Sequence, residues 1–256
     1  MILRGQLVYS FKMNITYETK YHHLEKNHWW FSSRREVICG IVERFATQDN
    51  SVLDVGCSSG LLLQDLHNLG FKKSNLYGID VSNNAISRAK KLSPGNYSVM
   101  DGASLNFPED TFDIIISSDS LEHIESDEKA TKEWMRCLKP NGVLIIFVPA
   151  HSFLWSNHDV VNQHFRRYSK SRLTKLIINQ ASTLPLEWIQ TGYWNSLLSP
   201  LIVLIRLIQR TLNLPGKREG DLSESGKAVN IILKSILKIE SVLIKNKYSF
   251  PFGISV

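Results

Sequence analysis

The sequence predicts an α/β fold with a doubly wound, largely parallel sheet, and three observations predict it. Between residues 51 and 149, short runs rich in β-branched side chains alternate with longer runs that have helical spacing. A turn containing two glycines follows the first of these runs, and acidic residues follow the second and the third. Strands that alternate with helices form βαβ units, which place helices on both faces of a parallel sheet.

The elements of this sheet can be assigned in order. Five runs are expected to be strands, namely Ser51–Val55, Asn75–Asp80, Tyr97–Met100, Phe112–Ser117 and Val143–Val148. Three runs between them are expected to be helices, namely Gly60–Leu69, Asn83–Lys91 and Asp127–Leu138. The segment Lys139-Pro140-Asn141-Gly142 is expected to stop the last of these helices and to turn the chain.

The regions on either side divide the chain into three parts. Residues 1–50 are expected to form an N-terminal helical cap, since Tyr17 to Ile38 is rich in aromatic residues and histidine. Residues 51–192 form the core. Residues 193–256 are expected to hold two basic amphipathic helices, Leu197–Leu214 and Lys227–Lys247, joined by a polar linker at Pro215 to Asp221, and a final strand.

Composition narrows the class of protein. Cysteines are few, odd in number and far apart at Cys39, Cys57 and Cys137, which argues against a disulfide framework and favours a reducing, cytoplasmic location. We expect no secretory leader at Met1 to Tyr9 and no membrane-spanning helix, because no apolar run is long enough. The net charge is +6, and residues 165–256 hold fourteen Lys and Arg against five Asp and Glu.

The glycine turn after the first strand is the candidate cofactor site. Asp54 leads into Gly56, and Gly60 opens a helix, so the backbone can approach a ligand closely at Cys57 and its neighbours. A dinucleotide site prefers three glycines spaced G-x-G-x-x-G for a pyrophosphate. The acid two residues before Gly56 suits a zwitterionic ligand with an ammonium group better than a pyrophosphate.

Later strand ends supply further contacts to such a ligand. Asp80 and Val81 follow the second strand, where the carboxylate can accept hydrogen bonds from both ribose hydroxyls. Asp101, with Gly102 and Ala103, follows the third strand and can accept from an exocyclic adenine amine. Ser118 stands at the end of the fourth strand and completes the predicted cofactor set.

Together these motifs resemble the class I S-adenosylmethionine-dependent methyltransferases of the broad UbiE/UbiG-like type. The resemblance covers about residues 28–180 and includes Asp101 to Pro108, Asp119 to Ile124 and Leu138 to Leu144. It implies a seven-stranded Rossmann-like methyltransferase sheet with added N-terminal and C-terminal helices, and S-adenosyl-L-methionine as cofactor. Ser58 stands where many members have glycine, which changes the turn only if that position needs a positive φ.

Histidines are the candidate catalytic bases, because an acceptor hydroxyl must lose its proton during methyl transfer. His123 follows the fourth strand, and His158 and His164 follow the fifth; the alternative for His123 is a cap or packing role. Asp119, Glu122 and His123 also match an acid-x-x-Glu-His arrangement that UbiG-like relatives use for a divalent metal. Many relatives carry similar residues without a metal, so we assign none.

Aromatic and basic residues flank the core and are candidates for binding the two ligands. Trp30, Trp155, Arg166, Arg167 and Tyr168 are expected to hold an anionic acceptor; the alternative is a polar lid whose arginines form only salt bridges. Arg35, in the aromatic segment before the first strand, is expected to lie near the methionine carboxylate of the cofactor.

The C-terminal helices raise the question of partners. Lys227, Lys234, Lys238 and Lys245 share one helical face, and Ile232, Ile236, Ile239 and Leu243 form an apolar stripe. The helix is either a cover for the core with a solvated face or a peripheral contact with an acidic membrane, and Leu197–Leu212, with Arg206 and Arg210 opposite its isoleucines, adds weight to the membrane. No nucleic-acid partner is expected. The final strand, from Tyr248 to Val256, is expected to be short or to be completed by a second copy in a homodimer.

These observations predict O-methylation of a small-molecule natural product, or of a glycan or lipid-linked intermediate. N-methylation or C-methylation remains an alternative, as does a non-catalytic nucleotide-binding protein with the same fold. An NAD-dependent oxidoreductase is disfavoured, because the sequence has neither the dinucleotide fingerprint nor a convincing Tyr-x-x-x-Lys pair.

Overall fold

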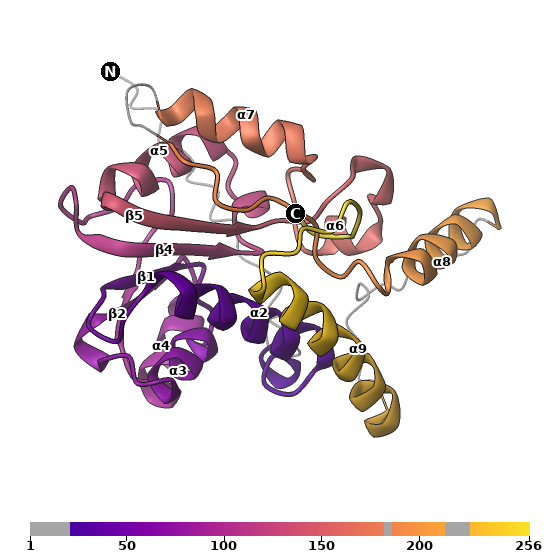
Figure 1. The fold of residues 1–256 in the computed structure, drawn as a ribbon, viewed down its shortest axis with the longest axis horizontal. Coiled ribbons are helices and arrows are strands. Elements are labelled where there is room, and N and C mark those ends of the chain that lie inside the picture. The colour runs from indigo at the N-terminus through magenta and orange to yellow at the C-terminus, as the bar shows by residue number, and fades with distance from the viewer. Residues whose placement is uncertain (1–20, 182–185, 213–225) are drawn as a thin grey trace, which may run out of the picture.

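The computed structural model describes residues 21–181, 186–212 and 226–256. Its centre is a parallel sheet with the strand order β3-β2-β1-β4-β5 (Figure 1). The strands are β1 (Val52–Val55), β2 (Leu76–Asp80), β3 (Asn96–Val99), β4 (Phe112–Ser118) and β5 (Leu138–Phe147). Val52 pairs with Leu76 on one side and with Ile114 on the other, so β1 lies between β2 and β4. The parallel α/β sheet is therefore confirmed.

Helices cover both faces of this sheet. Their bounds are α2 (Trp29–Phe45), α3 (Leu61–Asn68), α4 (Asn83–Leu92), α5 (Asp127–Cys137), α6 (Asn157–Val161), α7 (Lys170–Ala181), α8 (Ser199–Thr211) and α9 (Lys227–Lys245), with short 3-10 turns η1 (Lys73–Asn75), η2 (Leu121–His123) and η3 (Ser152–Leu154). One apolar cluster joins α2, α3, α4 and α9 to the sheet, and a second joins α5 and α7 to it. The sequence places apolar residues on both faces of the central strands. In β1 all four residues are buried.

The predicted count of seven strands is wrong for the described residues, in which the sheet has five. Beyond β5 the chain forms single antiparallel bridges in place of strands, from Ser255 to both Pro149 and Trp194. Val148 and Val256 exchange backbone hydrogen bonds of 2.8 and 2.9 Å. The last residues thus lie beside the end of β5, but only Ile254, Ser255 and Val256 pair with the segment that follows it, and they form isolated bridges in place of a regular strand.

The predicted turn at Lys139 to Gly142 is also corrected. Helix α5 ends at Cys137, and β5 begins at once with Leu138, which pairs with Phe112. The next paired residues are Val143 and Ile114, so the four residues between form a bulge inside the strand. Asn141 has φ +64°, the left-handed conformation that such an irregularity needs.

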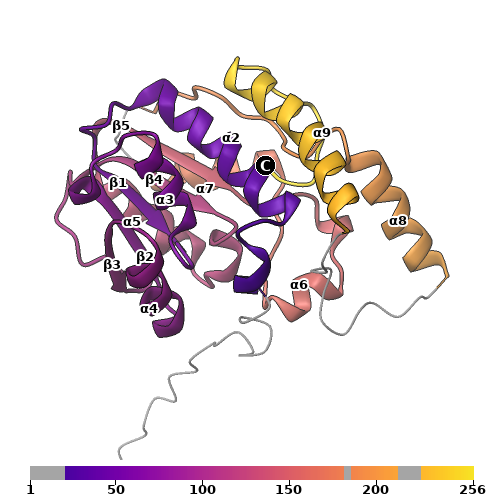
Figure 2. The ribbon, with the colours of Figure 1, turned by 90° about the horizontal axis from the view of Figure 1, so that it is seen from below.

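Helix α9 lies along α2, although the two are far apart in sequence (Figure 2). Asn230 accepts a hydrogen bond of 2.7 Å from the Trp29 amide and donates one of 3.1 Å to the carbonyl of Asn27. Lys245 pairs with Glu43 at 2.6 Å near the other end. The cap and the C-terminal part therefore pack together; residues 1–20 and the predicted linker at Pro215 to Asp221 lie outside the described residues. Within the described ranges, no helix is long and apolar enough to cross a membrane.

Candidate functional site

The glycine turn after β1 has the backbone geometry that the sequence predicts. Gly56 and Gly60 have φ values of +78° and +77°, and a Cβ atom would lie 2.5 Å from the Ser120 side chain at Gly56 and 2.6 Å from the Tyr97 hydroxyl at Gly60. Only glycine fits either position without displacing a neighbour. Ser58 has φ +49°, so this position does use the left-handed conformation, and serine adopts it at a steric cost.

A cavity lies between this turn, the start of α2 and the end of β4. Its lining includes predicted cofactor residues from three elements, among them Asp54, Gly56, Cys57, Ser118 and Arg35. Two side chains that reach it, Arg34 and Asp119, were not in the predicted cofactor set. Helix α2 therefore closes the cavity over the strand ends, in the position expected for a cap.

Arg34 brings a buried positive charge to this cavity. Its Nη2 donates to Asp119 at 3.2 Å and to the Ser255 hydroxyl at 2.9 Å, whereas Nε and Nη1 have no hydrogen-bond partner. The guanidinium lies 4.1 Å from the ring centre of Trp194 and 4.6 Å from that of Phe147. Burial lowers the pKa of Arg34, against the opposing effect of Asp119. Unused donors on a buried guanidinium indicate a site for an anionic group.

Asp54 brings a buried acid to the same cavity. Burial, and then the charge of Asp80, raise the pKa of Asp54 to about 7. A cation placed beside Asp54 would stabilise its ionised form. The cavity thus combines an acidic group and a guanidinium with spare donors, a pair that fits an amino-acid zwitterion.

Arg35 and Cys57 line the cavity as predicted, but their own groups are engaged or inert. Arg35 Nε donates to Asp65 at 2.7 Å, and its two Nη atoms donate to the carbonyls of Glu25 and Lys26. Burial raises the pKa of the Cys57 thiol, which is therefore uncharged. The two neighbouring arginines thus have different partners: Arg35 binds the segment before α2 at Glu25 and Lys26, and Arg34 directs its free donors to the cavity.

The predicted nucleotide contacts lie along the ends of β2 and β3. Asp80 accepts from the Ser58 amide at 3.0 Å and from the Ser82 amide at 2.8 Å, so it fixes the glycine turn in this structure. Val81 is exposed, which is unusual for valine so close to a buried strand. Asp101 accepts from the amide of Ala103 at 2.8 Å. A Cβ atom on Gly102 would lie 3.0 Å from Ile124 and Val55, so packing accounts for this glycine.

The three predicted histidines come together in one cluster, although they come from two separate loops. The ring centres of His123 and His164 are 4.6 Å apart, and those of His158 and His164 are 6.0 Å apart. Glu122 lies against this cluster with one oxygen, Oε2, that has no hydrogen-bond partner. Burial, and then the charge of Asp119, raise the pKa of Glu122.

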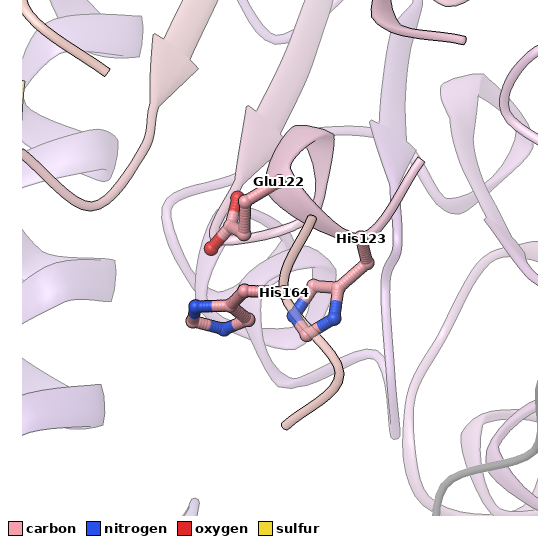
Figure 3. A group of neighbouring side chains, drawn as sticks. All are labelled: Glu122, His123 and His164. Atoms are coloured by element: carbon pink, nitrogen blue, oxygen red, sulfur yellow. The ribbon is translucent and has the colours of Figure 1, made fainter. Parts of the chain in front are cut away.

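Figure 3 shows the side chains of Glu122, His123 and His164 grouped together. Their ligand atoms lie within 4.8 Å of one another, and in the described part of the chain this is the one group of three that could hold a metal ion. Two imidazoles and a carboxylate suit zinc or ferrous iron. The metal alternative considered from sequence combined Asp119 with Glu122 and His123; in the structure, His164 stands in the place of Asp119, which pairs with Arg34 instead.

Asp159 holds His164 and Arg167 in place beside the cluster. It is fully buried, accepts from Arg167 through both carboxylate oxygens at 2.7 and 3.0 Å, and lies 2.9 Å from His164 Nδ1. It also accepts from the Ser156 amide at the start of α6, in a capping box. Together with these partners, Asp159 fixes the ring of His164 and leaves Nε2 directed away from it.

The other two histidines differ from His164. Burial, followed by the charge of His164, lowers the pKa of His123 to about 3 and that of His158 to about 4. Both rings are therefore neutral at physiological pH and are weak proton acceptors. Of the three predicted bases, His164 has the arrangement that general-base catalysis requires.

The predicted acceptor-binding residues are largely occupied by contacts within the protein. Arg166 donates to the carbonyls of Ile124 and Glu125, Arg167 binds Asp159, and the hydroxyl of the buried Tyr168 donates to Asp127 at 2.9 Å. Trp30 packs edge-on against Trp194 at 4.9 Å between ring centres, beside Arg34. Trp155 alone of this set has an exposed ring. In this structure both arginines bind groups of the protein itself, as in the alternative of a polar lid. Binding of an acceptor by these arginines stays a prediction.

Comparison with known proteins assigns the central part of the chain. Residues 53–146, from β1 to β5, match the family model described as a methyltransferase domain. Over these residues the chain is similar to that family. The matched part begins at the Asp54 turn and includes Glu122 and His123, whereas Arg34, Asp159 and His164 lie outside the matched residues.

The relatives that match this part of the chain have varied names. The chain is 35% identical over 104 residues to 2-methyl-6-phytyl-1,4-hydroquinone methyltransferase of Synechocystis sp., covering 38% of the chain and 31% of that protein. It is 30% identical over 99 residues to ubiquinone biosynthesis O-methyltransferase of Bradyrhizobium diazoefficiens, covering 37% and 38%. It is 26% identical over 140 residues to phosphoethanolamine N-methyltransferase of Plasmodium falciparum, covering 51% and 49%. The chain thus spans about a third of the first two relatives and half of the third.

Solved structures agree on the fold. The chain is similar to a complex between the Haloferax volcanii Trm112 methyltransferase activator and a methyltransferase, with a TM-score of 0.55 and 18% identity over 65% of this chain and 73% of that chain. It is also similar to a SAM-dependent methyltransferase from Thermotoga maritima, with a TM-score of 0.51 and 17% identity over 65% and 77%. At these identities the likeness concerns the fold alone.

The sequence did not identify Arg34 and Asp159 as parts of this site. The Arg34-Arg35 pair offered two candidates for one carboxylate contact, but only the tertiary fold shows that Arg35 donates to Asp65 and to two carbonyls while Arg34 keeps free donors. Asp159 stands between His158 and His164 in sequence and opens α6, so its role as a helix cap hid its role as their partner.

Proposed function

We propose that this protein is an S-adenosyl-L-methionine-dependent methyltransferase that methylates an oxygen of a small molecule or of a glycan or lipid-linked intermediate. The observation that carries the proposal is the cavity beside Gly56, where buried Asp54 and the free donors of Arg34 match the ammonium and carboxylate of a methionine group. A dinucleotide offers no such zwitterion at this turn. The matched methyltransferase domain supports the same cofactor.

The rest of the cofactor would extend along the sheet edge. Asp80 would hold the ribose hydroxyls, exposed Val81 would lie against the adenine ring, and Asp101 with Ala103 would meet the exocyclic amine. This arrangement requires Asp80 to exchange its present partners, the amides of Ser58 and Ser82, at least in part. Three free, buried cysteines support the cytoplasmic location that we propose.

Bound S-adenosylmethionine supplies an electrophilic methyl group on a sulfonium, so the protein needs chiefly to align the acceptor and to remove its proton. His164 would accept that proton at Nε2, because Asp159 holds Nδ1 on the other side of the ring. The resulting imidazolium would be stabilised by the buried carboxylate of Asp159. Glu122 would contact the acceptor from the cofactor side of the cluster.

A nitrogen acceptor is the second candidate. The relative from Plasmodium falciparum is named as an N-methyltransferase, and an amine acceptor that arrives protonated also needs a base. A carbon acceptor, or a nucleotide-binding protein without activity, has no observation of its own in the structure. Neither a small anionic acceptor nor a homodimer is assigned by these contacts, and both stay proposals.

Calorimetric titration tests the cofactor. Purified protein is titrated with S-adenosylmethionine, S-adenosylhomocysteine and NAD, with Asp80→Ala as the variant. We expect micromolar binding of the first two ligands, weakened in the variant, and no binding of NAD. Binding of NAD alone would contradict the proposal, as would the absence of binding by all three.

A further inference from the structure

Helix α9 is apolar on two sides, and only one of them is used by the fold. Leu237 and Ile244 are buried against α2 and the sheet. On the opposite side Ile231, Ile232, Ile239, Val242 and Leu243 are exposed. Three of the four residues in the apolar stripe predicted from sequence therefore face outward, whereas a cover helix with a solvated face would be polar there.

Helix α8 shows the same feature more strongly. No residue from Leu201 to Gln209 is buried, and Leu201, Leu204, Ile205, Leu207 and Ile208 are exposed. Figures 1 and 2 both show α8 and α9 at the same end of the molecule, projecting beyond the sheet. Scattered apolar side chains are ordinary on a surface, but a large continuous group marks an interaction site.

The start of α8 is fixed to α9 by a buried acid. Both carboxylate oxygens of Glu240, on α9, accept from the Ser196 amide at 2.9 Å, and one also accepts from the Leu197 amide at 3.2 Å. Glu240 is fully buried, so this contact is shielded from water. The chain is therefore joined to α9 just before α8 begins, which holds the two helices at one end of the molecule.

Charge decides which partner fits this surface. Lys227 and Lys238 are exposed and, with Lys234, lie along one edge of the outer apolar face of α9, whereas Lys245 on the same edge pairs with Glu43. Residues 165–256 carry fourteen basic and five acidic side chains. An apolar face bordered by lysines fits a bilayer with anionic headgroups, whereas a second copy of the same face would bring like charges together.

We propose that α8 and the outer face of α9 form a docking surface for an anionic phospholipid bilayer. The apolar side chains enter the headgroup boundary, and the lysines contact lipid phosphates. Neither helix spans the bilayer.

The docking surface adjoins the histidine cluster. Burial, and then the charge of Arg167, lower the pKa of Arg206 on α8, and Asp159 acts on it in the opposite direction. Arg206 in turn contributes to the lowered pKa of His158. Figures 1 and 2 both show α6, the helix that carries His158 and Asp159, at the end of the molecule that carries α8, and His164 lies 2.9 Å from Asp159. Docking would therefore favour a lipid-linked acceptor over a free small molecule. This last consequence rests on the proposed function, whereas the docking does not.

Vesicle flotation of the full chain tests the docking surface. Vesicles are made of phosphatidylcholine alone, or of phosphatidylcholine and phosphatidylglycerol in equal parts. We expect the protein to float with the mixed vesicles and to bind vesicles of phosphatidylcholine alone at least about tenfold more weakly. Leu204→Asp and Ile239→Asp should each lower binding to the mixed vesicles by about tenfold. The double variant Lys227→Glu with Lys238→Glu should also lower binding to the mixed vesicles, and this loss should grow with the fraction of phosphatidylglycerol.

Leu92→Asp is the matched control, because Leu92 is 55% exposed at the end of α4 and Leu204 is 53% exposed. An equal loss of vesicle binding in Leu92→Asp and Leu204→Asp would overturn the docking surface, as would a wild-type protein that does not float with the mixed vesicles. A stable dimer seen by light scattering, without vesicle binding, would assign the face to a second copy. Calorimetry with S-adenosylmethionine on the same samples separates the two proposals, since flotation without cofactor binding contradicts only the proposed function, and the converse contradicts only the docking.

Discussion

The cavity beside the glycine turn and the histidine cluster lie next to each other but leave different groups free. In the cavity, Arg34 keeps two unused donors and Asp54 is buried. In the cluster the charged side chains Asp159 and Arg167 bind each other, and His164 is held by Asp159. Unused charge suits the binding of a charged ligand, while an imidazole ring fixed by a buried acid suits the movement of a proton. The comparison therefore assigns binding to one region and chemistry to the other.

Substitution in the cluster should change turnover most. His164→Gln removes the proton acceptor, so we expect turnover to fall by about 1,000-fold while the affinity for S-adenosylmethionine stays unchanged. His67→Gln is the control, because His67 is an exposed histidine on α3. A steady-state assay with an accepted substrate measures the change. Equal rates for the two variants would remove His164 from the chemistry.

Substitution in the cavity should change affinity instead. Arg34→Met removes the buried guanidinium, and we expect the affinity for S-adenosylmethionine to fall about 100-fold, whereas that for 5′-methylthioadenosine, which lacks the amino-acid group, is kept. Arg35→Met is the neighbouring control, since Arg35 binds Asp65 and two carbonyls. Calorimetry on folded variants measures both ligands. A larger loss in Arg35→Met would return the carboxylate contact to Arg35.

The acid in the cavity should make cofactor affinity depend on pH. Because the pKa of Asp54 is raised to about 7, the group is mostly neutral below that pH and ionised above it. An ammonium ligand favours the ionised form, so affinity for S-adenosylmethionine should rise about tenfold from about pH 6 to about pH 8. Asp54→Asn should abolish the rise, and 5′-methylthioadenosine should not show it. The same rise in the Asn variant would contradict the contact.

The histidine cluster should also make the free energy of unfolding depend on pH, and this effect is smaller than the effects on turnover and affinity. The folded-state pKa of His123 is lowered from 6.5 to about 3, so below pH 6.5 the unfolded chain binds a proton that the folded protein does not. Stability contributed by neutral His123 is thus lost as the pH falls toward 3. His123→Gln should reduce the loss of unfolding free energy between pH 6.5 and about pH 5 by about 1 kcal/mol. Urea titrations at both pH values check this, and the difference from wild type cancels the opposite contribution of Asp54.

The sequence predicts local features well where one residue decides them. The Gly56 and Gly60 turn, the five strands and the acids at the strand ends follow from periodicity and from backbone limits on non-glycine residues. Contacts between distant segments do not follow: His123 meets His164, and Arg34 meets Asp119 and Ser255, only through tertiary packing. The outer face of α9 was predicted as a stripe, but which stripe packs on α2 depends on the partner helix and not on periodicity.

A crystal structure with S-adenosylhomocysteine tests the central claim most directly. This account predicts that the homocysteine carboxylate binds Nε or Nη1 of Arg34, that its ammonium lies on the Asp54 side of the cavity, and that Asp80 contacts the ribose. An amino-acid group bound away from Arg34, or a ligand outside the cavity at Gly56, would contradict the assignment of binding to this region.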